Sequence, residues 1–495
     1  MNKNKIISLI CITTFFSTNV LAEEIPQQNL TIYQVMQRVL DKYPSLKIAT
    51  LAVEQAAHQK QLIESQLGWI LNSSSGVTHD LTALGTPSDR LDITASFGRK
   101  LSSGASLSLS GGYRYEDSSL ALSSVLPNPA HTTRLDLNYR LPLLQGEGNP
   151  AYQEGITASE TSYRVAKASH SLTRLQLAEK VKDVFYTSAL TLARLKNASQ
   201  SVRRAQQLKK AVNKDIKLGL LEKKDRLQVE AQLNSVLSEL STIKIVQKQQ
   251  NSSLNRLMLE DWNSTSNLVL TEPGSNSGYS VSRLIKQTVA YHPSLKILQE
   301  KLTLAESKIY SAKDNKKDNL DLVMSVGSRT SNGKSTTGTV SEQDWAGSIK
   351  LEYKHLFDNK GLSAKHNQAL IDKNIAEYNI QTLEDDIRYR VAGLVAEIEA
   401  AQETVKSAKL KLHSESLKLK EAEQRFRNGR TNTAQLIQFH NEYSFAKLSL
   451  QKQVIDLNNR IVSLQIFSGE FWYKFPNNTD AIGNTPQASV MGVVK

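Results

Sequence analysis

The sequence has 495 residues, of which 39% are hydrophobic and 22% are charged, and it contains only 11 prolines. This composition argues against a disordered or linker-rich protein and provides ample apolar material for a core. The formal net charge is +13, but the Lys and Arg residues are spread along predicted helices among Glu and Gln. Because no finger-like or Gly-Phe-rich motif accompanies them, nucleic acid is not an expected partner.

Residues 1–22 have the pattern of a secretory signal peptide. Two lysines precede an apolar stretch, and small residues precede a predicted cleavage between Ala22 and Glu23. The apolar stretch is short for a membrane span, which needs about 20 residues, so cleavage is favoured over an uncleaved anchor. The single cysteine, Cys11, would leave with this segment, and the loss of two lysines would lower the charge from +13 to +11. We therefore expect a mature chain without disulfides, cysteine ligands or a lipid anchor.

The rest of the sequence has no apolar run of about 18 residues, so a protein that spans a membrane with helices is not expected. Any membrane span would consist of strands, because strands that alternate between lipid-facing and lumen-facing residues give only a weak hydropathy signal.

An internal repeat organises the chain. Residues 43–48 read YPSLKI and residues 292–297 read HPSLKI, at an offset of 249 residues. A second correspondence aligns Gly219 with Gly429 at an offset of 210, so the first half holds 39 extra residues between its landmarks. We predict two repeats, residues 23–272 and 273–475, each with a short helix, a strand zone and a long helical hairpin.

The strand zones are predicted at about residues 72–141 and 319–355. Strict alternation of apolar and polar residues supports them, at 91–97, 105–115 and 134–141 in the first zone and at 320–326 and 349–353 in the second. The first zone has more alternating segments than two strands need. The surplus could form a longer external hairpin, and its place is left open.

The long helical hairpins are predicted at about residues 151–262, with a tip at 218–220, and 362–470, with a tip at 428–430. No proline interrupts residues 151–272 or 294–475, and apolar residues recur with coiled-coil spacing. An arm over residues 151–218 would be about 100 Å long. The arms alone fit a plain helical bundle equally well, but the signal peptide and duplicated strand zones favour a few strands per chain that feed a shared barrel. Residues 476–495 are predicted to be a flexible tail.

From about residue 30 to residue 472, the ordered set of motifs resembles the TolC family of outer-membrane efflux proteins. The closest match is the string from Gly429, GRTNTAQLIQFHNEYSFAKLSLQKQVIDLNNRIVSLQIFSGEFW, and the segment YRLPLLQGEGNPAYQEG from Tyr139 fits the same pattern. The resemblance implies a mixed α and β membrane protein with an internal duplication. It also implies a homotrimer in which each chain gives four strands to a twelve-stranded outer-membrane β-barrel, continuous with a long periplasmic α-helical barrel.

The function that the resemblance implies is that of an outer-membrane channel subunit in a tripartite efflux or type I secretion system. Such a subunit lies in the outer membrane of a Gram-negative bacterium, contacts its lipid and extends into the periplasm. Its partners would be a periplasmic adaptor, or membrane fusion protein, and an inner-membrane pump of the RND or ABC type. The sequence leaves the cargo open, since the pump selects it.

The resemblance also suggests site residues at the helical tips. Family members close their periplasmic gate with two aspartates just past the second tip, and here those positions hold Gln435 and Gln438. An amide lacks the anionic field that attracts cations, so weaker cation block is expected. The equivalent positions in the first hairpin are Asp225 and Gln228; Asp225 would either supply a gate charge or be a solvent-exposed helix acid. Adaptor docking is expected at the two tips, where each glycine could equally be a helix stop: Leu218, Gly219, Leu220, Asn428, Gly429 and Arg430.

Catalysis is not expected. The nine histidines are scattered without metal-binding spacing, and the stretch Gly146–Gly148 lacks a full phosphate-binding pattern. We predict no enzyme activity, no metal site and no cofactor. The alternative function is a periplasmic or surface coiled-coil scaffold or adhesin without channel activity, which would share the helical seam but would not need duplicated strand zones.

Overall fold

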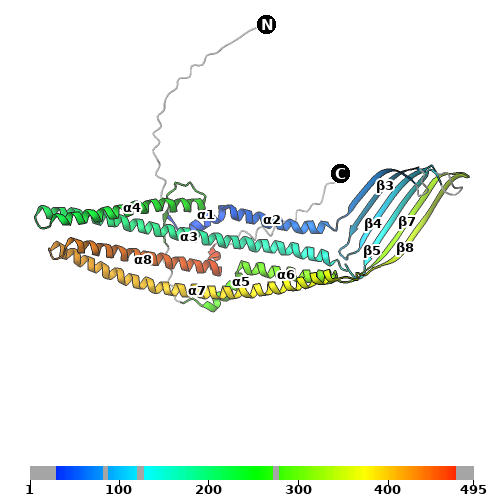
Figure 1. The fold of residues 1–495 in the computed structure, drawn as a ribbon. Coiled ribbons are helices and arrows are strands. Elements are labelled where there is room, and N and C mark those ends of the chain that lie inside the picture. The colour runs from blue at the N-terminus through cyan, green and yellow to red at the C-terminus, as the bar shows by residue number, and fades with distance from the viewer. Residues whose placement is uncertain (1–28, 82–86, 120–126, 271–277, 475–495) are drawn as a thin grey trace, which may run out of the picture.

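The computed structural model describes residues 29–81, 87–119, 127–270 and 278–474. The predicted signal peptide, with its cleavage position at Ala22 and Glu23, and the predicted tail at 476–495 lie outside these residues. The molecule is elongated, with long helices that run to one end and a twisted sheet at the other (Figure 1).

The helices of the two halves match in order and in length. The longest helix of each half, α3 or α7, has 68 residues, and the return helix, α4 or α8, has 36. Pro44 and Pro293 occupy the first turn of the second helix in each half, where a missing N–H is tolerated. The bounds are α1 Ile32–Lys42, α2 Pro44–Ser65, α3 Pro150–Lys217, α4 Lys223–Met258, α5 Val281–Tyr291, α6 Pro293–Asp314, α7 Lys360–Arg427, α8 Thr433–Ser468 and the 3₁₀ helix η1 Glu470–Lys474.

The helices pack side by side in a fixed order. Both α2 and α4 pack on α3, both α6 and α8 pack on α7, and α3 contacts α6 and α8 to join the halves. Figure 1 shows α2 continuing the line of α4 along α3. One long edge of the molecule is therefore formed by α4 and α2, and the opposite edge by α7. No helix in the described ranges combines the length and the apolarity needed to cross a membrane.

The apolar seam predicted for the long arms is confirmed as the core. Val181 and Phe185 of α3 pack with α1, α4 and η1 in one cluster, and Ile387, Val391 and Ile398 of α7 pack with α5 and α8 in a second. Burial of such side chains contributes about 1.5–3 kcal/mol each. A short parallel pair, β1 (Asn29–Leu30) with β6 (Asn267–Leu268), ties the start of the first half to its end.

The sheet is a continuous antiparallel meander in the order β2-β3-β4-β5-β7-β8. The expectation of four strands per chain is wrong, because the described residues place six strands in this sheet. A barrel of twelve strands assumes four strands from each of three chains, so it does not fit a sheet of six described strands. The strands are β2 Ile70–Leu81, β3 Pro87–Lys100, β4 Ser106–Ser118, β5 Ala130–Pro142, β7 Asn319–Ser335 and β8 Gly338–Lys354.

Candidate functional site

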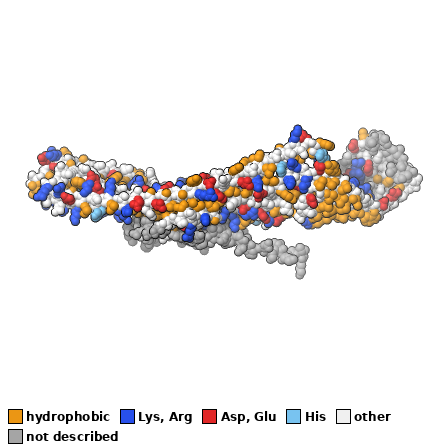
Figure 2. Space-filling view, turned by 90° about the horizontal axis from the view of Figure 1, so that it is seen from below, with side chains coloured by type: hydrophobic (Ala, Val, Ile, Leu, Met, Phe, Trp, Pro, Cys, Tyr) orange, Lys and Arg blue, Asp and Glu red, His pale blue; other side chains and the backbone are white. Residues whose placement is uncertain are grey.

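One face of the sheet is apolar and exposed. Residues that pair across neighbouring strands share a face, and one such row runs through all six described strands as Leu71, Phe97, Leu109, Leu137, Val326 and Gly347. On the edge strand β8, Ile349 and Leu351 of the same face are 78% and 68% exposed. Hydrophobic side chains gather over the sheet next to the helices in Figure 2. An exposed apolar surface of this extent marks a site of membrane or protein contact.

The opposite face of the sheet carries charges that pair across strands. Asp92 accepts from Arg114 at 2.6 Å, and Glu116 accepts from Arg90 at 3.3 Å. Arg140 of β5 reaches Asp321 of β7 at 2.5 Å and Glu352 of β8 at 2.6 Å. These pairs are partly exposed, so each contributes only about 0–1 kcal/mol. Their significance is the pattern: one face of the sheet suits water, and the other suits lipid.

Aromatic side chains lie near both ends of the apolar face. Tyr353, close to the helices, donates to Asp318 at 2.7 Å, and Trp69 stacks on Phe97 with 4.7 Å between ring centroids. Trp345 stands eight residues along β8 from Tyr353, which is about 26 Å at 3.3 Å per residue. Aromatic residues that bound an apolar band about 25 Å tall are typical of outer-membrane strands.

The helix-proximal turn between β3 and β4, residues 101–105, is fixed to the loop that leads into α3. The Gly148 N–H donates to the Ser103 carbonyl at 3.0 Å, and the Asn149 side chain donates to the Leu101 carbonyl at 3.4 Å. Gly104 has φ +90°, and a Cβ there would lie 2.2 Å from the Gly146 carbonyl oxygen. Only glycine allows this approach of the two backbones.

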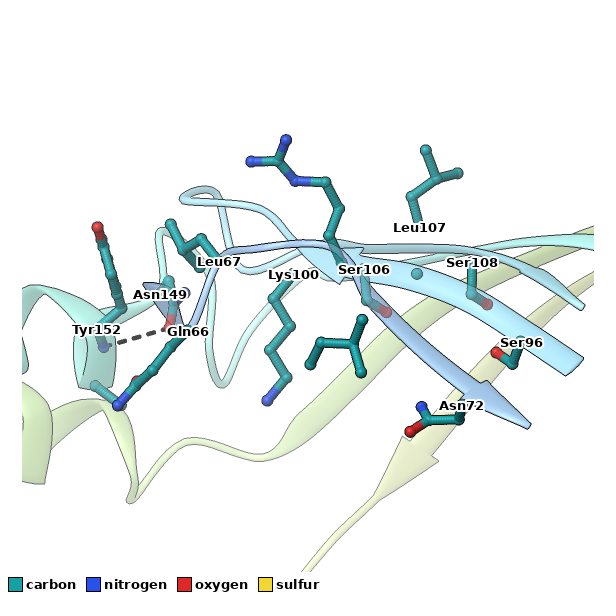
Figure 3. A pocket seen from close by; sticks show the side chains of 14 residues that line it. Gln66, Leu67, Asn72, Ser96, Lys100, Ser106, Leu107, Ser108, Asn149 and Tyr152 are labelled. Carbon is teal, nitrogen blue, oxygen red and sulfur yellow. Dashed lines mark hydrogen bonds between the residues drawn. The ribbon is translucent and has the colours of Figure 1, made fainter. Parts of the chain in front are cut away.

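A cavity of about 630 Å³ lies beside this turn, between strands β2 to β4 and the start of α3. In Figure 3, Asn72, Ser96 and Ser108 line it from the strands, with Lys100 nearby. The dashed line in the same view is the bond by which the Asn149 side chain caps the Tyr152 N–H of α3, at 3.4 Å. The cavity thus opens on the polar face of the sheet, where sheet and helices join.

At the other end of the molecule, the two hairpin tips have the same backbone structure. Gly219 and Gly429 have φ +74° and +69°, in the left-handed region. The Leu220 N–H donates to the Asp215 carbonyl and the Arg430 N–H to the Arg425 carbonyl, both at 2.9 Å and five residues apart. These bonds satisfy the last carbonyls of α3 and α7. The candidate docking residues Leu218, Gly219, Leu220, Asn428, Gly429 and Arg430 are all exposed.

One apolar cluster holds the two tips together. Leu208 and Val212 of α3 and Val229 of α4 pack with residues of α7 and α8, which include Leu419 and Leu436. The Gln232 amide also donates to Asn441 across the two hairpins at 3.0 Å. The tips therefore lie side by side at the same level, as Figure 1 shows.

The candidate gate residues of the second hairpin are exposed on the first turns of α8. The Gln435 N–H is capped by the Asn432 side chain at 2.8 Å, and the Gln438 amide donates to Glu442 at 2.9 Å. This bond, followed by the bond from Lys418 at 3.0 Å, holds the pKa of the Glu442 carboxyl below its usual value. Gln438 is thus bonded to a negative charge on Glu442, one helical turn further on, which the sequence analysis did not single out.

Asp225 is buried at the start of α4 rather than solvent-exposed. It is only 7% exposed, and its carboxylate accepts from the Glu222 N–H at 3.1 Å in the capping box that starts α4. The interpretation as a solvent-exposed helix acid is wrong, and the carboxylate is engaged in the cap. Gln228, one turn further, is exposed.

His440 of α8 is half-buried against α3, close to the tips. Burial, followed by the nearby charge of Arg204, lowers its pKa to about 4. Arg204 donates to Ser444 across the same contact, and the carboxylate of Glu423 lies 3.9 Å from the imidazole Nε2. Within the described ranges, no group of three or more His, Cys, Asp or Glu side chains is placed to hold a metal ion.

Comparison with solved structures identifies the fold. A structure of CusC, described for conformational changes that accompany folding and transmembrane channel formation, has a TM-score of 0.66 at 15% identity and covers 90% of this chain and 96% of its own. The outer membrane protein VceC of Vibrio cholerae has a TM-score of 0.64 at 14% identity, with 88% and 96% covered. The CmeC outer membrane channel of Campylobacter jejuni has a TM-score of 0.63 at 16% identity, with 91% and 88% covered.

No family profile and no curated protein sequence matches the chain. The structural likeness nevertheless extends over nearly the whole length of both partners in each pair. At these identities it establishes the fold. The resemblance to outer-membrane efflux channels that the sequence predicts is therefore confirmed at the level of the fold.

Proposed function

We propose that this protein is the outer-membrane channel subunit of a tripartite efflux or type I secretion system, and that it acts as a homotrimer. The observation that carries the proposal is that each protomer is open along both long edges. One edge runs through α4, α2 and β2, and the other through α7 and β8. Both edges expose apolar side chains along the helices, on α2 at Ile48, Leu51 and Leu62 and on α7 at Ile371 and Ile375.

Association of copies through these edges would bury the exposed apolar side chains of the helices and pair the edge strands of the sheet. Exposed apolar stripes on helices favour packing against another helix, and unpaired edge strands present free N–H and C=O groups to another chain. A closed ring places the apolar face of each sheet toward lipid and its charged face toward a lumen. This assigns the chain to a Gram-negative outer membrane, with its helices in the periplasm.

The tips would form the periplasmic end, where a membrane fusion protein and an inner-membrane RND or ABC pump engage. Both tips expose their docking residues while a shared core fixes their relative position. We assign the gate to the turn of α8 that carries Gln435 and Gln438, with Gln228 at the equivalent place in α4. Asp225 supports this region through its cap. A gate lined by amides would attract cations less than a gate lined by carboxylates.

The first experiment is to measure the mass of the purified protein in detergent and its conductance in planar bilayers. We expect a trimer with small, mostly closed conductance. The double variant Gln435→Asp and Gln438→Asp should become blockable by divalent and trivalent cations. A matched control adds two carboxylates far from the tips and away from the apolar stripes, at the exposed Gln61 of α2 and Gln381 of α7, and should leave cation sensitivity unchanged.

A monomer without conductance would overturn the channel proposal in favour of the scaffold or adhesin. A conducting trimer whose double variant behaves like the control would keep the channel and refute the gate assignment.

A further inference from the structure

We propose that three copies of this chain close an eighteen-stranded barrel, in which β8 of one copy pairs with β2 of the next. Three copies of the six strands described in each chain give this number. The inference deepens the proposed function and rests on its trimer. It departs from the twelve-stranded arrangement that the family resemblance implies, because the first half of the chain contributes four described strands to the sheet.

The additional strands β3 and β4 are integral to the sheet. Of the six strands described in this sheet, β2, β5, β7 and β8 connect directly to helices, whereas β3 and β4 form a hairpin inserted between β2 and β5. The insertion pairs without interruption, from Ser88 opposite Ser118 to Lys100 opposite Ser106. Its helix-proximal turn is bonded to the loop before α3, so the hairpin is held at the level of the other strands. A longer external hairpin is therefore not the place of the surplus segments.

The two edges of the sheet fit each other. Neighbouring strands alternate in direction, and with an even number of strands the edges β2 and β8 point in opposite directions. The edge of one copy can therefore pair antiparallel with that of the next. Side chains along the whole of β2 and most of β8 are exposed, and neither strand contains proline. These long edges contain no proline, and their pairing with β3 and β7 is not interrupted by a bulge, so both backbones can pair with a further strand. A second copy, which offers the complementary edge, is the occupant that this geometry favours.

The size of the ring follows from the number of strands. With strands about 4.8 Å apart and tilted by about 40°, eighteen strands give a backbone diameter of about 36 Å, against about 24 Å for twelve. Each chain places four helix positions side by side below the sheet, so three copies place twelve around the ring. At 8–10 Å between helix axes, twelve helices give a ring about 31–38 Å wide, and an eighteen-stranded barrel continues it at about the same width. The cavity of about 630 Å³ lies at this junction, where the inserted turn meets the start of α3.

Disulfide cross-linking of the full chain can test which strands are neighbours. Cys11 is the only cysteine of the sequence, and Cys11→Ser removes it as a background thiol. On that background Ser74→Cys in β2 is combined with Ser348→Cys in β8, which share the polar face. Because the register between copies is set only on assembly, Asn72→Cys and Gly76→Cys are each combined with Ser348→Cys as well. A disulfide needs Cα atoms about 4.4–6.8 Å apart, so only direct neighbours react.

Two matched pairs report the alternative arrangements. Ser110→Cys in β4 with Ser348→Cys would cross-link copies only if β2 and β3 lay outside the barrel. Ser74→Cys with Asn138→Cys in β5 would link within one chain only if β3 and β4 were expelled. We expect covalent trimers from at least one β2–β8 pair and none from either control, with projection images of the trimer showing a ring about 36 Å wide.

Each contrary result has a distinct meaning. A β4–β8 or β2–β5 disulfide, or a trimer with a ring about 24 Å wide, would overturn the eighteen-stranded barrel and leave the channel proposal intact. A protein that is monomeric before oxidation and forms no β2–β8 disulfide would refute both.

Discussion

The two halves of the chain are nearly identical in their helices and clearly different in their strands. The long helices have 68 residues in both halves, the return helices have 36, and both tips end in the same pattern of backbone hydrogen bonds. The first half nevertheless gives four of the described strands to the sheet, and the second half gives two.

The difference shows which dimensions of this fold are constrained. One additional residue would lengthen a helix by 1.5 Å and rotate its apolar stripe by about 100°, so the two tips would no longer meet over a common core. A sheet has no such restriction, because an inserted hairpin adds two strands and leaves the direction of every other strand unchanged. Duplicated helices are therefore held to equal length, while the strand zone can grow by whole hairpins.

The largest expected effect comes from the contact that anchors the inserted hairpin. Gly104→Ala would place a Cβ 2.2 Å from the Gly146 carbonyl oxygen at a φ of +90°, so the backbone must move. We expect a loss of more than about 3 kcal/mol, because a steric clash is added to backbone strain. Gly148→Ala is the matched control, since its φ is +71° with open space around the Cβ, and it should lose about 1 kcal/mol.

The measurement is the temperature at which each variant loses its heat-modifiable migration on a gel. Equal shifts for the two variants would show that the turn is not held against the loop, and would weaken the case for an integral hairpin.

A half-buried histidine, His440, should make the second tip more sensitive to acid than the first. His440 of α8 corresponds to Glu230 of α4, which instead pairs with Lys209 at 3.1 Å. The folded-state pKa of His440 is about 4, below the usual 6.5, so the unfolded chain binds the proton more readily. Its contribution to stability is complete above pH 6.5 and is lost as the pH falls to about 4, by roughly 3 kcal/mol at the acid end.

His440→Gln should therefore flatten the pH profile of thermal unfolding, measured by circular dichroism from pH 7 to pH 4. The side chain is 16% exposed, so solvent screens it little. Glu230→Gln serves as the control at the equivalent position. If the wild type and His440→Gln keep parallel profiles over this range, the burial of a neutral imidazole does not contribute to the acid sensitivity.

Much of the helical region could be predicted from the sequence because its signals are local and repeated. The seam residues Ile387, Val391 and Ile398 lie in the core, as their spacing indicates. The strand zone was harder to predict. The strand β2 reads ILNSSSGVTHDL, with small polar residues on both faces, so its alternation is weak. Its position becomes evident only from its pairing with β3, which is a contact between segments rather than a property of either one.

The candidate gate residues also depend on contacts that the sequence alone does not show. Alignment on Gly219 and Gly429 placed Asp225 opposite Gln435, and both stand at the third position of a return helix. What each side chain does there depends on the residue at the start of the helix. Asn432 caps α8 with its own side chain, whereas at Glu222 of α4 the cap requires the carboxylate of Asp225. Glu442 lies four residues after Gln438 on α8, so that bond is local, but its bond with Lys418 depends on the approach of α7 to α8 and could not be predicted from the sequence.

The smallest expected effect tests whether the two tips are energetically as alike as their geometry suggests. Gly219→Ala and Gly429→Ala each place a Cβ in open space at a φ near +70°, so strain alone should cost about 1 kcal/mol in both. Gly219→Asn and Gly429→Asn should lose less, because asparagine tolerates the left-handed region. Thermal unfolding of the four variants is the measurement. A clearly larger loss at one tip would mean that this glycine has a contact in the assembled protein that the protomer does not show, and would identify that tip as the one packed more tightly against neighbouring copies.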